Sequence, residues 1–177
     1  MPMWEIIVIA VVVLIAAVLI LAATKSGVFQ VERATTIGAA PEKIFPLVND
    51  FKHWAAWSPY EKKDPAMKRT FSGAATGRGA VYEWEGNRQV GMGRIEITDT
   101  SAPSRVTIKL DMIKPMEGHN IVDFTLEPRG AATRVTWAMR GACAYPAKVM
   151  GLFLNVDKMV GRDFETGLTN LKALAEK

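Results

Sequence analysis

The amino-acid sequence predicts an α+β protein. It has a curved antiparallel sheet of about seven strands, two short helices, one long C-terminal helix and an apolar helix at the N-terminus. Three observations support this prediction. Residues 6–23 form an unbroken apolar run, residues 67–140 contain segments in which apolar and polar side chains alternate, and residues 147–177 show helical spacing. We expect an N-terminal transmembrane anchor over residues 1–24 and one folded domain over residues 25–177.

The apolar run from Ile6 to Ala23 carries no charge, glycine or proline. A helix of this length just crosses a hydrocarbon core of about 30 Å. Trp4 and Lys25 stand at its ends, where an amphipathic ring and a long ammonium side chain prefer to lie. We therefore expect residues 4–25 to contact a lipid bilayer as a single-pass span. Lys and Arg residues follow the run and none precedes it, which predicts a cytoplasmic domain.

A cleaved secretory signal is the alternative for this run. Signal peptides have a basic start, a shorter apolar stretch and small residues before the cut. Here the only charged side chain before the run is Glu5, and Leu21 would occupy the third position before a cut after Ala23. The sequence therefore favours an anchor over a signal peptide.

The charges lie in the domain and are interleaved. Residues 25–177 hold all 22 Lys and Arg residues and 17 of the 18 acidic residues. The densest basic patch, within residues 62–69, is interrupted by Asp64, whereas a nucleic-acid surface needs a basic stripe. We therefore expect no nucleic-acid partner, but a mild attraction to anionic lipid headgroups. Cys143 is the only cysteine, so the chain forms no internal disulfide, which fits a reducing compartment.

The first elements after the anchor are one strand and two short helices. Val28–Ile37 is expected to be a strand. Pro41 suits the first turn of a helix, where its missing N–H costs nothing, and Asn49-Asp50 keeps that helix short. A second helical turn covers Phe51–Trp57 and ends at Ser58-Pro59, because a residue before proline avoids the α region.

The middle of the chain alternates with period two, as expected for antiparallel strands with one buried and one wet face. The residues expected on the buried face are Tyr82 and Trp84; Ile95 and Ile97; Val106, Ile108, Leu110 and Met112; Val122, Phe124 and Leu126; and Val135, Trp137 and Met139. Turn-forming Gly, Pro and Asn residues separate these segments. Further glycines, such as Gly91 and Gly93, predict bulges or bends that curl the sheet.

The C-terminal segment predicts one long helix from about Ala147, with a possible break near Asn155–Asp157. Its apolar residues recur every three or four positions, and charged residues fill the opposite face. Gly167 lies on the apolar side, where glycine costs about 1 kcal/mol relative to alanine. It marks either a close contact with the sheet or a gap in the packing.

This element order and three local motifs resemble the START/Bet v 1-like superfamily, also called SRPBCC, and within it the polyketide cyclase/dehydrase-like branch. The motifs are Trp-Ala-Ala-Trp-Ser-Pro-Tyr-Glu-Lys-Lys-Asp-Pro at 54–65, Tyr-Glu-Trp-Glu-Gly-Asn at 82–87 and Asp-Phe-Glu-Thr-Gly-Leu-Thr-Asn-Leu-Lys at 163–172. The resemblance covers residues 28–177 and implies a helix-grip fold, in which the sheet curls around the last helix. Such proteins include lipid carriers, cyclases, hydratases and chaperone cofactors, so the resemblance implies a fold more firmly than an activity.

A sheet curled around a helix encloses either a cavity or a filled core. The residues expected to bind a ligand there are Tyr82, Trp84, Ile97, Leu110, Phe124, Trp137, Met139, Phe153 and Phe164. This lining is almost wholly apolar, so it suits a hydrophobic small molecule or lipid. Trp54, Trp57 and Tyr60 form a separate cluster that we interpret as packing, with gating of a pocket as the alternative.

Residues with catalytic potential are few. If the domain is an enzyme, Tyr82 would donate a hydrogen bond and His119 would act as the base. Asn87 and Asn120 are further polar groups that could reach a cavity, whereas Cys143 lies between alanines without an activating charge. No metal site is expected, because the only two histidines lack further ligands at close spacing. No cofactor is expected either, since Gly91-Met-Gly93 lacks the rest of a dinucleotide-binding pattern.

The sequence therefore favours a membrane-anchored binding or carrier domain for a hydrophobic small molecule. Two alternatives remain open. One is a cyclase or hydratase that uses the same pocket, and the other is a chaperone-assisting or protein-interaction module with a filled core. The sequence does not determine the ligand or the oligomeric state.

Overall fold

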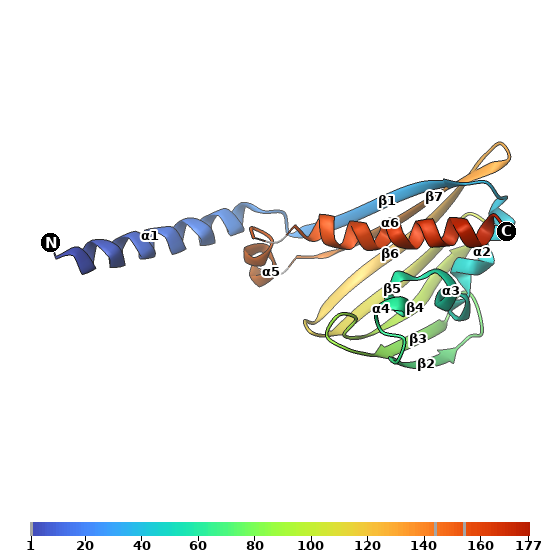
Figure 1. The fold of residues 1–177 in the computed structure, drawn as a ribbon, viewed down its shortest axis with the longest axis horizontal. Helices are drawn as coiled ribbons and strands as arrows, with labels where there is room; N and C mark the ends of the chain where they lie inside the picture. Colours follow the sequence, from blue (N-terminus) through green and yellow to red (C-terminus); the bar gives the residue numbers. More distant parts are fainter. Residues whose placement is uncertain (1, 144, 154) are drawn as a thin grey trace.

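The computed structural model describes residues 2–143, 145–153 and 155–177. Figure 1 shows an N-terminal helix that extends from a domain built of a sheet and a long helix. The elements are α1 (Met3–Thr24), β1 (Val28–Ile37), α2 (Pro41–Asn49), η1 (Phe51–His53), α3 (Trp54–Trp57), α4 (Pro59–Lys63), β2 (Lys68–Gly73), β3 (Ala80–Glu85), β4 (Met92–Ser101), β5 (Arg105–Lys114), β6 (Gly118–Arg129), β7 (Ala132–Ala142), α5 (Tyr145–Met150) and α6 (Val156–Ala175).

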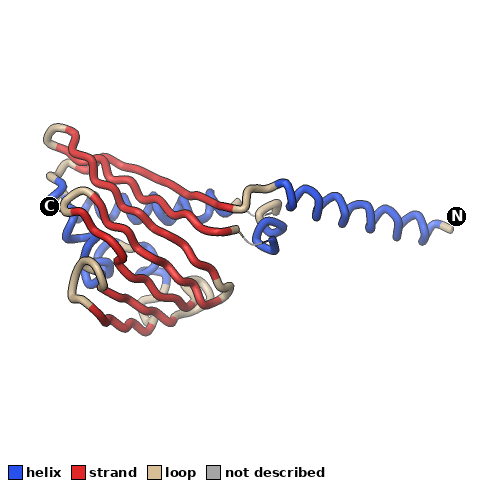
Figure 2. The backbone as a smooth tube through the Cα atoms, turned by 180° about the vertical axis from the view of Figure 1, so that it is seen from behind, coloured by secondary structure: helices blue, strands red, loops and turns tan. Residues whose placement is uncertain are grey.

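The seven strands form one antiparallel sheet in the order β1-β7-β6-β5-β4-β3-β2. Figure 2 shows the sheet curving, with the helices behind it on one face. The ladder between β4 and β5 is irregular between Met92 and Gly93 and again between Ile97 and Asp99. Such irregularities increase local twist and help a sheet to curl. The predicted helix-grip architecture is confirmed.

The segment between β1 and β2 forms four short helical pieces, where the sequence predicted two. Asp50 ends α2, and its side chain accepts a hydrogen bond from the N–H of Lys52, which starts η1. Ser58 has an extended conformation and Pro59 opens α4 in the position where proline is favoured. The predicted stop at Ser58-Pro59 is therefore present, but a new helical turn follows it.

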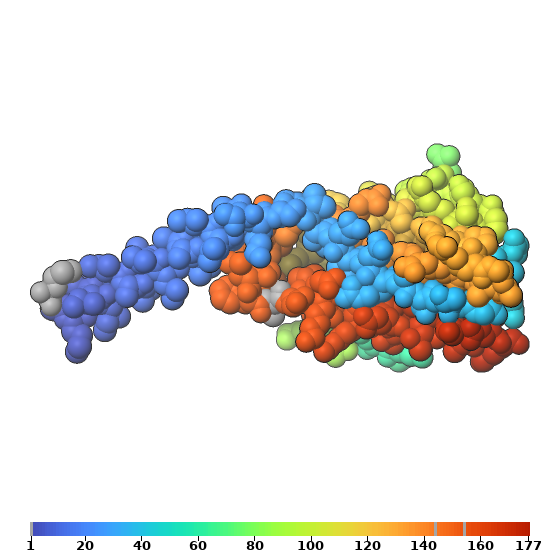
Figure 3. All heavy atoms as spheres, turned by 90° about the horizontal axis from the view of Figure 1, so that it is seen from above, coloured from blue at the N-terminus to red at the C-terminus, as the bar shows by residue number. Residues whose placement is uncertain are grey.

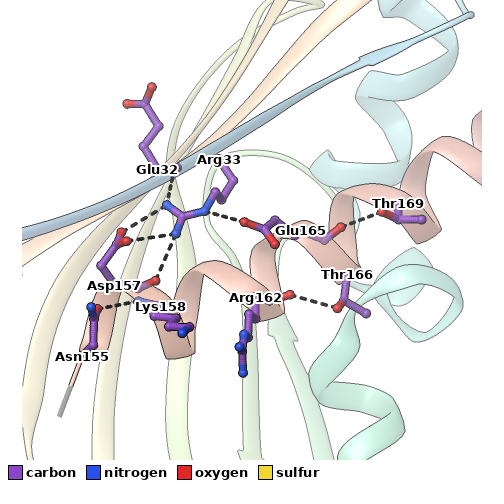
Figure 4. Close-up of polar contacts among 9 residues, drawn as sticks. All are labelled: Glu32, Arg33, Asn155, Asp157, Lys158, Arg162, Glu165, Thr166 and Thr169. Atoms are coloured by element: carbon purple, nitrogen blue, oxygen red, sulfur yellow. Dashed lines mark hydrogen bonds and ion pairs between the residues drawn. The ribbon is translucent and has the colours of Figure 1, made fainter.

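The C-terminal helical region divides just before the predicted break, since α5 ends at Met150 and α6 begins at Val156. The side chain of Asn155 accepts a hydrogen bond from the N–H of Lys158 and caps α6, and α5 is a separate short helix. The start of α6 is fixed to β1 by Arg33 (Figure 4). Its guanidinium contacts both carboxylate oxygens of Asp157 at 3.0 and 3.1 Å and Oε1 of Glu165 at 2.8 Å.

Two glycines allow α6 to lie close to its neighbours. A Cβ added to Gly161 would overlap the guanidinium of Arg33. One added to Gly167 would lie 2.6 Å from the ring of Trp137 and 3.1 Å from Pro59. Gly167 is therefore a site of close contact, and the alternative of a packing gap is wrong.

Aromatic side chains fill the end of the domain beneath α2 and α3. Phe124 lies between Trp54, Trp57 and Trp137, with ring centroids 4.9 to 6.0 Å apart, and Trp137 stacks on Phe164 at 4.1 Å. The indole N–H groups of Trp54 and Trp57 donate to backbone carbonyls of α2. The two tryptophans are buried, as expected for packing residues.

Helix α1 is long and apolar enough to cross a membrane, and nearly all of its side chains are exposed. These properties fit both a membrane anchor and a signal sequence. Figure 3 shows α1 extending away from the domain, with α5 beside its last turns. The hydroxyl of Tyr145 donates to the Leu19 carbonyl at 2.7 Å, and Nζ of Lys148 donates to the Lys25 carbonyl at 2.9 Å.

Candidate functional site: an apolar cavity under the last helix

A cavity of about 380 Å³ lies between the concave face of the sheet, α4 and the first half of α6. This volume falls at the lower end of the range for small-molecule sites. The aromatic cluster around Phe124 fills the remaining space under α6, so the core is solid at one end and hollow at the other. The sheet curvature and α6 therefore leave room for one small ligand.

The deep wall of the cavity is apolar. Ile95, Ile108, Val122 and Met139 supply it from four neighbouring strands, since their side chains occupy the inward positions of the period-two pattern. Trp84 lies across the backbone of β4, where a Cβ on Gly93 would be 2.5 Å from the indole ring. The absence of a side chain at position 93 thus leaves room for the indole ring next to the backbone of β4.

One buried polar group is built into this apolar wall. The Glu61 carboxylate, 8% exposed, accepts a hydrogen bond from the Tyr82 hydroxyl at 2.6 Å and from Nε of Arg69 at 2.7 Å. Burial and the bond to Glu61 raise the pKa of Tyr82 above its ordinary value. At neutral pH the Tyr82 hydroxyl is therefore a neutral donor, and its proton is already engaged by the carboxylate.

The partly exposed lining residues gather at one end of the cavity and form its rim. Met159 and Val160 come from the first turns of α6, Met112 and Asn120 from the facing ends of β5 and β6, and Gln89 from the β3–β4 loop. An ion pair between Lys63 and Asp163, at 2.6 Å, joins α4 to α6 beside this opening. A ligand would enter between these elements.

Six of the nine predicted ligand-binding residues line the cavity: Tyr82, Trp84, Leu110, Trp137, Met139 and Phe164. Ile97 and Phe124 point inward as expected, but they lie in the solid part of the core. Phe153 is 73% exposed and lies outside the cavity, because the helical region is interrupted before α6. These three residues therefore do not line the space that a ligand would occupy.

His119 does not face the cavity. It precedes Asn120 on β6, and Asn120 points inward, so the alternation of the strand places His119 on the outer face. There Nδ1 of His119 lies 2.6 Å from Asp111, and the side chain is well exposed. The pairing of Tyr82 with His119 as donor and base therefore does not form. Asn87 also faces away and organises the β3–β4 loop.

Glu61 and Arg69 were not foreseen as site residues, since they stand in a run of charged residues that resembles a solvated surface. A signal was present in Tyr82, because a tyrosine on the buried face of a strand needs a partner for its hydroxyl. Among the described residues, no group of three His, Cys, Asp or Glu side chains is arranged to hold a metal ion.

Residues 28–176 match the family model described as polyketide cyclase / dehydrase and lipid transport. The chain belongs to this family. The match spans the whole sheet and α6, and the family associates this domain with lipids and other hydrophobic ligands. No curated protein matches the sequence.

Solved structures share the fold of this family member. Protein CV1439 from Chromobacterium violaceum is 15% identical, with a TM-score of 0.60 over 85% of this chain and 98% of that one. The Aha1 dimer from Colwellia psychrerythraea is 18% identical, with 0.57 over 84% and 96%. The protein TTHA0849 from Thermus thermophilus is 19% identical, with 0.58 over 83% and 97%. At these identities the likeness establishes the fold alone.

Proposed function

We propose that residues 25–177 bind or carry one hydrophobic small molecule or lipid, and that residues 1–24 tether them to a membrane. The observation that carries this proposal is the cavity of about 380 Å³, whose deep wall is formed by apolar side chains of β4, β5, β6 and β7. Apolar ligands are held by such walls with few polar groups for orientation. Asn120 at the rim and the Glu61–Tyr82 pair in the wall supply those few groups.

The cavity chemistry supports a carrier over a cyclase or hydratase. Catalysis of that kind requires a base within hydrogen-bond reach of the substrate. His119 lies on the opposite face of the sheet, and Arg69 neutralises the Glu61 carboxylate. The raised pKa of Tyr82 also makes it a weak proton donor at neutral pH. The cavity itself argues against the third alternative, an interaction module with a filled core.

The tether is supported by α1, which has the length and apolar character of a membrane span. Lys25 immediately follows it and no basic side chain precedes it, so the same proposal places the domain on the cytoplasmic side. Carbonate extraction of native membranes would test the tether, and protease treatment of separate, sealed vesicles would test on which side the domain lies. Release of the protein, or protection of the domain inside sealed cytoplasmic-side-out vesicles, would contradict them.

Native mass spectrometry of the detergent-purified full chain would test ligand binding. We expect an adduct of a hydrophobic molecule that is lost on substituting Leu110→Trp, because the larger ring would occupy the cavity. Ile121→Trp is the matched control, since Ile121 lies on the outer face of the neighbouring strand. An adduct that persists in Leu110→Trp, or that also disappears in Ile121→Trp, would contradict binding in this cavity.

A further inference from the structure

The cavity opens at the end of the domain from which α1 extends. Val28 and Ala142 pair where β1 begins and β7 ends, and the N–H of Cys143 bonds to the Gly27 carbonyl at 2.8 Å. The rim residue Asn120 pairs with Gly141 at this same end of the sheet. Figure 3 shows the molecule hollowed here, between the α1–β1 connection and the first turns of α6.

Large apolar side chains are exposed around this opening. Phe153 and Met159 stand just before and within the first turn of α6, and Ile113 and Met116 stand on the β5–β6 hairpin, all of them more than half exposed. Met159 also lines the cavity, so the apolar surface continues from the cavity to the outside. Exposed apolar patches of this kind mark membrane or partner contacts.

The position of α1 indicates which surface covers this patch. Only residues 25–27 separate α1 from β1, a reach of about 10 Å, and α5 holds the last turns of α1 through Tyr145 and Lys148. A bilayer crossed by α1 therefore lies directly against this end of the domain. Lys25, Lys114, Lys148 and Lys158 also lie here, and none pairs with a carboxylate among the described residues, which favours anionic headgroups.

We propose that Phe153, Met159, Ile113 and Met116 insert into the bilayer that α1 crosses, so that the cavity opens into the membrane and receives its ligand laterally from the lipid phase. The inference rests on the proposed function. It adds that these four side chains contact the bilayer. It also adds that the ligand is a membrane-resident molecule whose apolar part is small enough to fit the cavity. The apolar route through Met159 spares such a molecule any passage through water.

Site-directed spin labels on the full chain would test the contact. In a Cys143→Ser background, single cysteines replace Met116, Phe153 and, as a control, Ala131, which is exposed at the opposite end of the sheet in the β6–β7 turn. In nanodiscs of phosphatidylcholine and phosphatidylglycerol, we expect labels at 116 and 153 to collide with oxygen more than with a water-soluble nickel chelate. We expect the reverse at 131. Equal nickel access at all three positions would overturn the proposal.

Uptake of a pyrene-labelled fatty acid would test the route. The variant Phe153→Ser/Met116→Ser changes only exposed residues beside the opening, neither of which lines the cavity. Withdrawing two large apolar side chains from a bilayer shifts a partition equilibrium by about a hundredfold or more. We therefore expect uptake from vesicles to slow by at least about tenfold. Equilibrium binding from detergent micelles should stay unchanged. Unaltered uptake by this variant would overturn the lateral route. Failure of the wild type to bind any hydrophobic molecule would overturn the proposed function. The bilayer contact would then still be tested by the spin-label measurements.

Discussion

Tyr82→Phe tests the buried polar group in the cavity wall. The substitution removes one hydroxyl and leaves the ring, so the Glu61 carboxylate loses the donor at 2.6 Å and keeps Arg69. A hydrogen bond to a charged group contributes about 1.5–3 kcal/mol. For a domain of this size each kcal/mol lowers Tm by about 2–4 °C, so we expect a fall of about 3–12 °C. Thermal unfolding of the detergent-purified chain would measure it.

Tyr60→Phe is the matched control for this experiment. Tyr60 also lines the cavity, but its hydroxyl has no protein hydrogen-bond partner within the described part of the chain. Its loss should change stability by no more than about 0.5 kcal/mol. A double-mutant cycle with Glu61→Gln should show that Tyr82 and Glu61 are coupled. If Tyr82→Phe and Tyr60→Phe have the same Tm, the Tyr82 hydroxyl is not held by the Glu61 carboxylate, and the buried polar pair in the cavity wall is refuted.

Three further outcomes are expected. Gly167→Ala should cost about 1–3 kcal/mol, because the new methyl group would overlap the adjoining indole, whereas Thr166→Ala on the exposed face of α6 should be nearly neutral; equal Tm values would contradict the close contact. The bond from Arg33 lowers the pKa of Asp157, so the stabilisation of the fold by this ion pair is present at neutral pH and is lost as the pH falls below about 4. The Tm of Asp157→Asn should therefore fall less than that of the wild type over that pH range. The raised pKa of Tyr82 disfavours its ionisation in the fold, so stability should fall above about pH 10, and Tyr82→Phe should reduce that fall. For each variant, a dependence of Tm on pH equal to that of the wild type over the stated range would contradict the corresponding prediction.

The strand faces were predictable because their alternation is regular. Val122, Phe124 and Leu126 read directly as one buried face of β6, and the structure buries all three. The division of helical segments was harder to foresee, since four short pieces between β1 and β2 depend on the caps at Asp50 and Ser58. The side-chain hydrogen bond of Asp50 and the proline that follows Ser58 set these boundaries, and hydrophobic periodicity does not report them.

The site was predictable only in part, because facing inward is not the same as facing a cavity. Phe124 points inward but meets the tryptophans of α3, whose packing position follows from tertiary structure rather than from the strand pattern. His119 and Asn120 are adjacent on one strand, so strict alternation admits only one of them to the interior. Glu61 escaped detection because its partner Tyr82 is 21 residues away in the sequence.

The short link between α1 and β1 limits what the domain can reach. With residues 25–27 as the only spacer and α5 in contact with the helix, a domain tethered by α1 would have no flexible linker on which to reach a second membrane. A protein anchored in this way would hold its ligand beside one bilayer and would not carry it between two membranes. Any recipient of its cargo would then have to come to it, within the same membrane or docked at its surface.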